Sequence, residues 1–152
     1  MASTPGYNST TAKASIPTGT AGTGTITASG ADNVITGTGT LFRSQCQING
    51  WIYVAASNEI VQVKSIESDT TIICTRNPVA FAGATFTSIL PKLLYKSVSV
   101  ISTGANGVIS TPLNGSKTLP SGMPVNYEDN DGVGAFAVDA TGGATIYIVT
   151  NR

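Results

Sequence analysis

The side chains that most often carry out catalysis are scarce in this sequence. The chain contains no histidine, which removes the commonest general base and the usual partner of a serine or cysteine nucleophile. Its two cysteines, Cys46 and Cys74, lie in apolar sequence, where burial raises a thiol's pKa and lowers its reactivity. We expect two small buried side chains, with a disulfide between neighbouring strands as the alternative. Two cysteines also leave too few ligands for structural zinc.

Carboxylates are the remaining candidates for acid–base chemistry or metal binding. They are Asp32, Glu59, Glu67, Asp69, Glu128, Asp129, Asp131 and Asp139. Nearly all fall at predicted turns or strand ends, where Asp and Glu serve solvation and capping. The densest group, residues 128–132, has oxygen ligands and a glycine but lacks the length and the closing glutamate of a calcium loop. We interpret it as a solvated turn, with binding of a hard cation as the alternative. The sequence predicts no catalytic, cofactor-binding or metal site, and therefore no enzyme.

Composition narrows the range of partners. Eight basic and eight acidic residues give zero net charge, and charged residues make up only 11% of the chain, against about a quarter in a typical domain. The basic residues are scattered, whereas nucleic-acid binding needs clustered Lys and Arg. No apolar run is long enough to span a membrane, and a signal peptide is not apparent. We expect neither nucleic acid nor membrane as a partner. A neutral surface rich in hydroxyl groups suits a protein docked in an assembly.

Turn signals and composition divide the chain into four segments. Residues 1–31 are rich in Thr, Ser and Gly and carry too little apolar surface to fold alone. We expect them to form an extended arm held by a neighbouring subunit, with folding back onto their own domain as the alternative. Residues 32–89 read as a small β-barrel domain, residues 90–96 as a linker, and residues 97–152 as a second β region.

Residues 32–89 carry the clearest strand pattern. Short β-branched and aromatic runs are separated by turn signals such as Asn49–Gly50. Alternation along WIYVA places Trp51 and Tyr53 on one face of a strand, with Ile52 and Val54 on the other. The sequence therefore predicts an all-β fold, a small barrel or sandwich with an extended N-terminal arm and a C-terminal β region.

Four pieces of this segment resemble a recurrent module of tailed-bacteriophage virion proteins. They are VITGTGTLF (34–42), INGWIYV (48–54), NEIVQVKSI (58–66) and SDTTI (68–72). The sequence departs from the module at Asn49–Gly50–Trp51, where the family often has Gly–Asp. The resemblance covers residues 34–72 and implies a small β-barrel used as a building block of capsid decoration, fibre and tail proteins.

These observations together predict a non-enzymatic capsid decoration (cement) protein, assembled in the host cytoplasm and located on the virion exterior. Its expected partners are the major capsid protein and further copies of itself, with a trimer favoured. A tail, neck or fibre-base component is one alternative. A host- or carbohydrate-binding module is another, for which Trp51 and Tyr53 are the only nearby aromatic pair.

Overall fold

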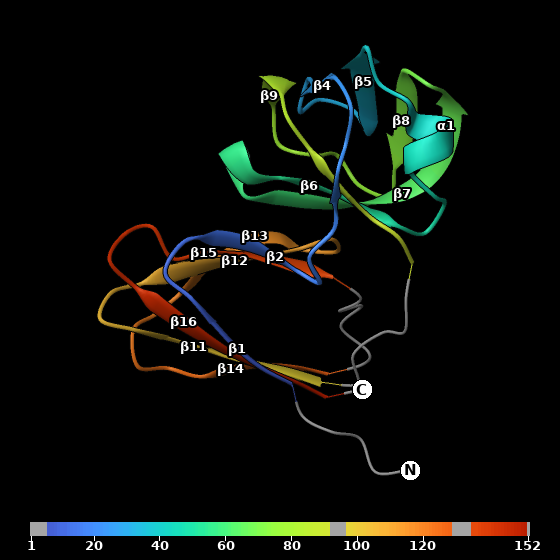
Figure 1. Cartoon of the computed structure of the whole chain (residues 1–152). Coiled ribbons are helices and arrows are strands. Elements are labelled where there is room, and N and C mark those ends of the chain that lie inside the picture. The colour runs from blue at the N-terminus through green and yellow to red at the C-terminus, as the bar shows by residue number, and fades with distance from the viewer. Residues whose placement is uncertain (1–5, 92–96, 129–134, 152) are drawn as a thin grey trace, which may run out of the picture.

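The chain folds into three antiparallel sheets arranged as two units (Figure 1). The computed structural model describes residues 6–91, 97–128 and 135–151. Strands account for nearly all of its regular structure, beside a single turn of helix α1 (Phe42–Gln45) and a short 3₁₀ segment (Ala55–Ser57). The predicted all-β fold is confirmed.

The first unit, which we call the curled unit, is one eight-stranded sheet. In spatial order its strands are β3 (Thr20–Ala21), β10 (Thr87–Ile89), β6 (Trp51–Val54), β7 (Glu59–Ser68), β8 (Thr71–Cys74), β5 (Val34–Thr38), β4 (Thr25–Ala28) and β9 (Phe81–Ala84). The sheet bends along β7, which pairs with β6 through its first four residues and with β8 through the rest, with register shifts in the second pairing. Such irregularities increase local twist and bend. The sheet remains open, because β3 and β9 form its two ends and do not pair with each other.

The second unit, which we call the sandwich unit, consists of two four-stranded sheets packed face to face. One sheet contains β1 (Gly6–Thr10), β16 (Thr145–Asn151), β11 (Ser97–Thr103) and β14 (Val125–Glu128) in that order. The other contains β13 (Gly115–Leu119), β12 (Gly107–Thr111), β15 (Phe136–Asp139) and β2 (Lys13–Ile16). Figure 1 shows the second sheet as the middle layer, between the curled unit and the β1–β14 sheet.

Each unit has its own apolar core, and a third cluster joins them. The core of the curled unit includes Ile26, Ile35 and Phe42, whereas the core of the sandwich includes Val100 and Phe136. The third cluster lies between the units and contains residues from the faces of β6 and β15 that point away from their own cores. Its members are Trp51, Tyr53, Ile60, Ile89, Ala135 and Ala137. The predicted alternation along β6 is confirmed, because its two faces are buried in different clusters.

The N-terminal segment is extended, as expected, and it folds back onto its own chain, which was the alternative to an arm held by a neighbouring subunit. Its strands pair within the chain: β1 with β16, β2 with β15, β3 with β10, and β4 with both β5 and β9. The segment therefore runs through both units and contributes Ile16 to one core and Ile26 to the other. Of the predicted linker 90–96, residues 92–96 lie outside the described residues.

The low-complexity composition of this segment has a packing cause. A Cβ atom on Gly19 would lie 2.4 Å from the carbonyl oxygen of Ser88, and one on Gly22 would lie 2.1 Å from the ring of Phe86. Contacts this short are not tolerated, so the backbone of the segment needs glycine to approach β10 closely. Small residues here serve close backbone packing, whereas the same composition in isolation indicates disorder.

Because Ile26 is completely buried in the curled unit, we expect Ile26→Ala to lower the free energy of unfolding by about 2–5 kcal/mol. Urea denaturation measures this value. The same substitution at Ile48, which is 55% exposed, serves as the matched control and should cost well under about 1 kcal/mol. Equal, small effects at both positions would show that β4 is not part of the core.

Candidate interaction surface

Among the described carboxylates, nearly all of which the sequence places at turns or strand ends, Glu59 is the one that the structure buries. Its side chain is 1% exposed and forms a two-bond ion pair with Arg76, in which Nη1 donates to Oε2 at 3.1 Å and Nη2 donates to Oε1. The Glu59 carboxylate also accepts hydrogen bonds from the backbone N–H groups of Val79 at 2.7 Å and Ile60 at 3.0 Å. With every lone pair engaged, this carboxylate has a structural role.

Arg76 extends this network to the sandwich unit. Its Nε donates to the carbonyl oxygen of Pro112 at 2.8 Å, and its Nη2 donates to that of Thr111 at 3.4 Å. Thr111 is the last residue of β12, and Pro112 begins the turn that leads to β13. Beside them, the Asn58 amide donates to the Ser110 hydroxyl at 3.4 Å. The ion pair therefore connects the start of β7, where Glu59 lies, to the β12–β13 turn of the sandwich unit. This connection lies beside the apolar cluster that joins the two units.

The other described carboxylates are exposed or partly exposed and bonded locally. Asp32 accepts from the Val34 N–H, Glu67 from the Ser65 hydroxyl, and Asp69 from the Arg43 N–H at the start of α1. Asp139 accepts from Thr141 and lies 3.9 Å from Lys13. These are the capping and turn contacts expected of Asp and Glu in such positions.

Within the described residues, no group of three or more Cys, Asp and Glu could hold a metal ion. Of the predicted acidic turn, Asp129, Asp131 and Gly132 lie outside the described residues, and Glu128 is the final residue of β14. The choice between a solvated turn and a cation site at 128–132 therefore stays a prediction.

The two cysteines are free and buried in the core of the curled unit, so the alternative of a disulfide between them is not what the structure contains. Burial raises the pKa of the Cys46 thiol, against a smaller lowering by a hydrogen bond with Ser88. Burial likewise raises the pKa of Cys74 to about 12, with a smaller opposing effect from Arg76. Neither thiol is suited to act as a nucleophile near neutral pH.

A hollow of about 260 Å³ lies beside β3 at one end of the curled sheet. Its lining includes Thr20, Ser44, Gln45, Ser88 and Leu90, which offer hydroxyl, amide and apolar groups but no acid or base. This hollow therefore adds no proton-transfer group to those already considered.

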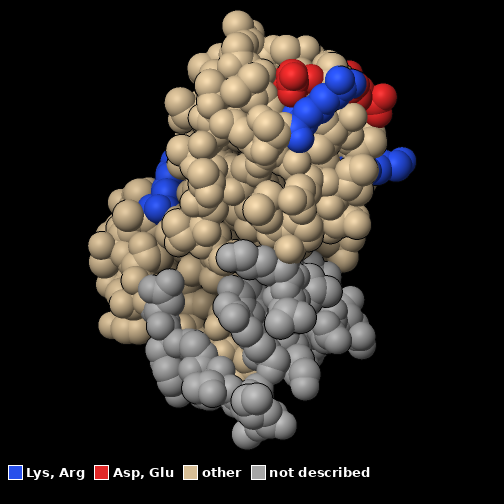
Figure 2. All heavy atoms as spheres, turned by 45° about the vertical axis from the view of Figure 1, so that its right-hand side comes forward, with Lys and Arg blue, Asp and Glu red and all other residues tan. Residues whose placement is uncertain are grey.

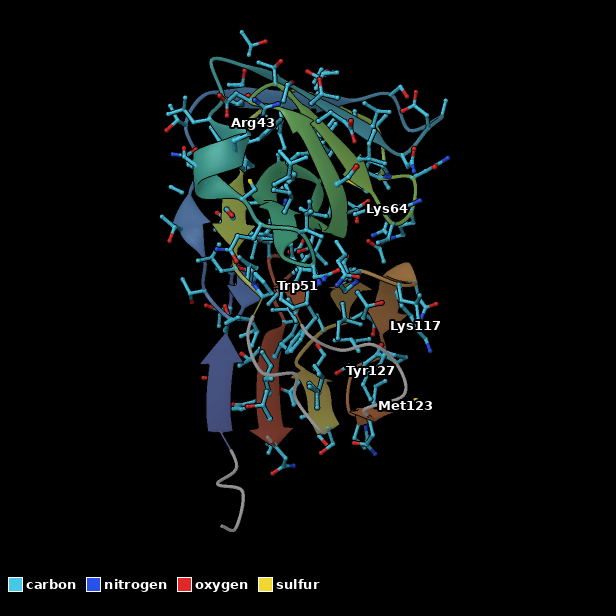
Figure 3. The ribbon with its side chains drawn as sticks, turned by 90° about the vertical axis from the view of Figure 1, so that its right-hand side faces the viewer. Arg43, Trp51, Lys64, Lys117, Met123 and Tyr127 are labelled. Atoms are coloured by element: carbon cyan, nitrogen blue, oxygen red, sulfur yellow. The ribbon has the colours of Figure 1, made fainter. Side chains whose placement is uncertain are left out.

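The carbohydrate-binding alternative loses the aromatic pair on which it rested. Trp51 is 4% exposed and Tyr53 is 6% exposed, because both belong to the cluster between the units. In Figure 3 Trp51 lies at the level where the two units meet. A ring that stacks on a sugar needs an open face, and these two rings are used for internal packing.

The outer face of the β1–β14 sheet is a broad, largely uncharged surface, on which the register pairs Ser97 with Glu128, the last residue of β14. On it lie Ser9, Ser97, Ser99, Ile101, Thr103, Asn126, Thr145, Tyr147, Val149 and Asn151, which alternate with the core residues of the same strands. We call this set the outer face. Tyr147 is 49% exposed and sits between Ser9 of β1 and Ile101 of β11 in the register. None of the ten residues is charged.

Hydrogen bonds between strands hold the polar side chains of the outer face in place. The Ser99 hydroxyl donates to the Asn126 side chain at 2.7 Å, and the Asn151 amide donates to the Ser97 hydroxyl at 3.0 Å. Side chains already fixed by their neighbours lose less conformational freedom when a partner covers them. The outer face is thus a largely uncharged surface with hydrogen-bonded polar side chains and an apolar centre formed by Ile101, Tyr147 and Val149.

Charged side chains lie mainly elsewhere on the molecule. Figure 2 shows one face of the molecule, on which the acidic side chains gather at the end formed by the curled unit and most other described atoms are uncharged. Arg43 and Lys64 lie at this same end in Figure 3, where Arg43 also donates to the Glu67 carbonyl oxygen at 2.8 Å.

No protein-family model, curated protein or solved structure matches this chain. No helix among the described residues is long and apolar enough to cross a membrane.

We expect the Cys74 thiol to make stability depend on pH in alkaline solution. Its pKa is about 12 in the folded protein and near the ordinary value of 9.0 when the chain unfolds. As the pH rises, the unfolded chain loses this proton first, so the free energy of unfolding is unaffected below about pH 9 and falls between about pH 9 and 12. Urea titrations of the protein and of Cys74→Ala measure the effect. An equally steep alkaline loss in both proteins would rule out this contribution.

The Glu59–Arg76 pair should be strongly coupled. We expect Arg76→Met to lower the free energy of unfolding by about 3–5 kcal/mol, because it leaves the Glu59 carboxylate buried without its counter-charge. Arg43→Met is the control at an exposed arginine and should cost about 1 kcal/mol or less. In a double-mutant cycle, Glu59→Leu combined with Arg76→Met should cost clearly less than the sum of the two single changes. Additive effects would contradict the coupling.

Proposed function

We propose that this chain is a non-enzymatic structural protein of a tailed-bacteriophage particle, and that it acts as a capsid decoration (cement) protein. The observation that carries the proposal is the outer face: a largely uncharged sheet surface with hydrogen-bonded polar side chains and an apolar centre. The resemblance of residues 34–72 to a phage virion module supplies the kind of particle. The proposed partner is the major capsid protein, together with further copies of this chain, at the exterior of the virion.

The physical argument rests on the cost of removing a surface from water. Docking a charged surface means desolvating its charges, which needs a closely matched partner. Hydroxyl and amide groups are less costly to desolvate when they find hydrogen-bond partners, and Tyr is favoured at the centre of protein interfaces. A neutral face also binds with little dependence on ionic strength. These properties suit a permanent contact with a shell.

The same argument disfavours a catalytic role. The described carboxylates are engaged in caps, turns and one buried ion pair, and the thiols are buried with raised pKa values. Under this proposal the chain acts by binding other proteins through its outer face. The seam between the units then keeps the two halves in one fixed geometry, so that the docked protein can bridge neighbouring shell subunits.

We expect Tyr147→Lys to weaken attachment to expanded capsids by at least about tenfold, which corresponds to roughly 1.4 kcal/mol, because it places a charge at the centre of the outer face. The measurement is co-sedimentation of purified protein with capsids that lack it. Leu41→Lys, at a residue 46% exposed in the curled unit, is the control and should bind normally.

Imaging of native particles by electron microscopy tests the location. Copies spread over the shell lattice support decoration, whereas copies confined to one vertex would replace this proposal with a tail, neck or fibre-base role. Equal capsid binding by Tyr147→Lys and the unmodified protein would remove the outer face from the proposal.

A further inference from the structure

The described sheets have six edge strands, and five of them carry features that discourage pairing with another chain. Natural proteins protect open edges with short strands, charges, prolines or irregular register. β3 has only two residues, and β9 has a register shift against β4 with Gly83 in the left-handed region. β13 carries the exposed Lys117, β2 carries Lys13, and β14 ends at Glu128.

β1 lacks these protections. It is five residues long and pairs with β16 in an unbroken register from Gly6 to Thr10. None of its residues is charged or proline. In Figure 3 β1 is the outermost strand of its sheet, with no described strand on its far side. In an antiparallel pair, alternate residues direct their N–H and C=O groups away from the partner, so β1 presents unpaired backbone groups along its free edge.

We propose that β1 pairs antiparallel with β1 of a second copy of this chain, about a two-fold axis. The inference does not depend on the virion role. The occupant follows from symmetry and charge: in a two-fold contact residue i of one copy meets residue j of the other, and j meets i. Each charged residue of the strand would therefore enter the same short contact twice with the same sign, so a strand suited to this contact carries no charge. β1 satisfies this condition, because the sequence GYNST is neutral throughout.

The alternative partner for this edge is β14 of another copy, in a head-to-tail ring. The direction of the strands would permit it, but the charges do not favour it. β14 ends at Glu128, where the sequence continues with Asp129 and Asp131, and β1 offers no basic residue to meet them. The two-fold arrangement joins two β1–β14 sheets into one sheet of twice the width, with the outer faces of the two copies side by side.

This contact places Ser9 at the centre of the test. Ser9 is exposed, lies on the outer face and is opposite Tyr147 in the register. In Ser9→Lys each copy brings a positive charge to the contact, and like charges that face each other across paired strands are destabilising. We expect the unmodified protein to sediment at twice the 15.4 kDa chain mass at micromolar concentration, and Ser9→Lys to raise the dimer dissociation constant by about tenfold or more.

Two matched variants sharpen the result. Thr118→Lys adds the same charge at an exposed position of the edge strand β13, and Asn126→Lys adds it on β14, at the opposite edge of the same sheet. Both should dimerise like the unmodified protein, and all three variants should melt cooperatively. A protein that is monomeric throughout, a trimer that Ser9→Lys leaves intact, or equal disruption by Asn126→Lys would each overturn the two-fold contact. Because these measurements use isolated protein, their failure leaves the capsid-binding test unaffected.

Discussion

The arrangement of the two units depends on one buried ion pair and the apolar cluster beside it. Glu59 starts β7, and Arg76 follows β8, so the pair first closes the curled unit on itself. The same guanidinium then donates to two carbonyl oxygens at the end of β12 and the start of the turn that follows it. Trp51 and Tyr53 exclude water from the adjoining seam. Charge pairing alone contributes little when partners are solvated, but here the burial of Glu59 makes the geometry of its partners obligatory.

This seam gives a small chain the properties of one rigid body. β6 and β15 each bury both faces, one in a unit's own core and one against the other unit. Hinge motion between the units would expose Trp51 and break the hydrogen bonds from Arg76 to the carbonyl oxygens of Thr111 and Pro112. A surface built on the sandwich unit therefore keeps a fixed orientation relative to the curled unit, which is what a bridging or layered assembly requires of its components.

The sequence revealed the class of fold and the inner and outer faces of single strands, but not the long-range pairing. Period-two alternation predicted the two faces of β6 because each face packs into a different apolar cluster. The pairing of β1 with β16, or of β2 with β15, joins opposite ends of the sequence and leaves no local signal. The N-terminal strands were read as an arm, since thin apolar content is the usual sign of disorder, whereas Gly19 and Gly22 are small because of what they touch.

The sequence predicts some properties of the candidate site and not others, because contacts between distant residues leave no local signal. The absence of histidine is visible in any reading of the sequence. The partnership of Glu59 with Arg76 is not, because seventeen residues separate them and neither stands in a motif. The local signal for the burial of Glu59 is its place at the start of an apolar strand, beside Ile60 and Val61, which are both completely buried. The outer face became visible only when β1, β11 and β16 were placed side by side.

The path of the chain also sets an order for synthesis. Residues 20–89 contain every strand of the curled unit, so that unit can complete itself while the rest of the polypeptide is still being translated. β1 and β2 are synthesised before the curled unit, yet their partners, β16 and β15, are synthesised after it. β2 has no partner strand within the chain until residue 139 has emerged, and β1 has none until residue 151 has emerged. Pairings this distant in sequence are slow to form, and the exposed interval is when a nascent chain most needs a chaperone.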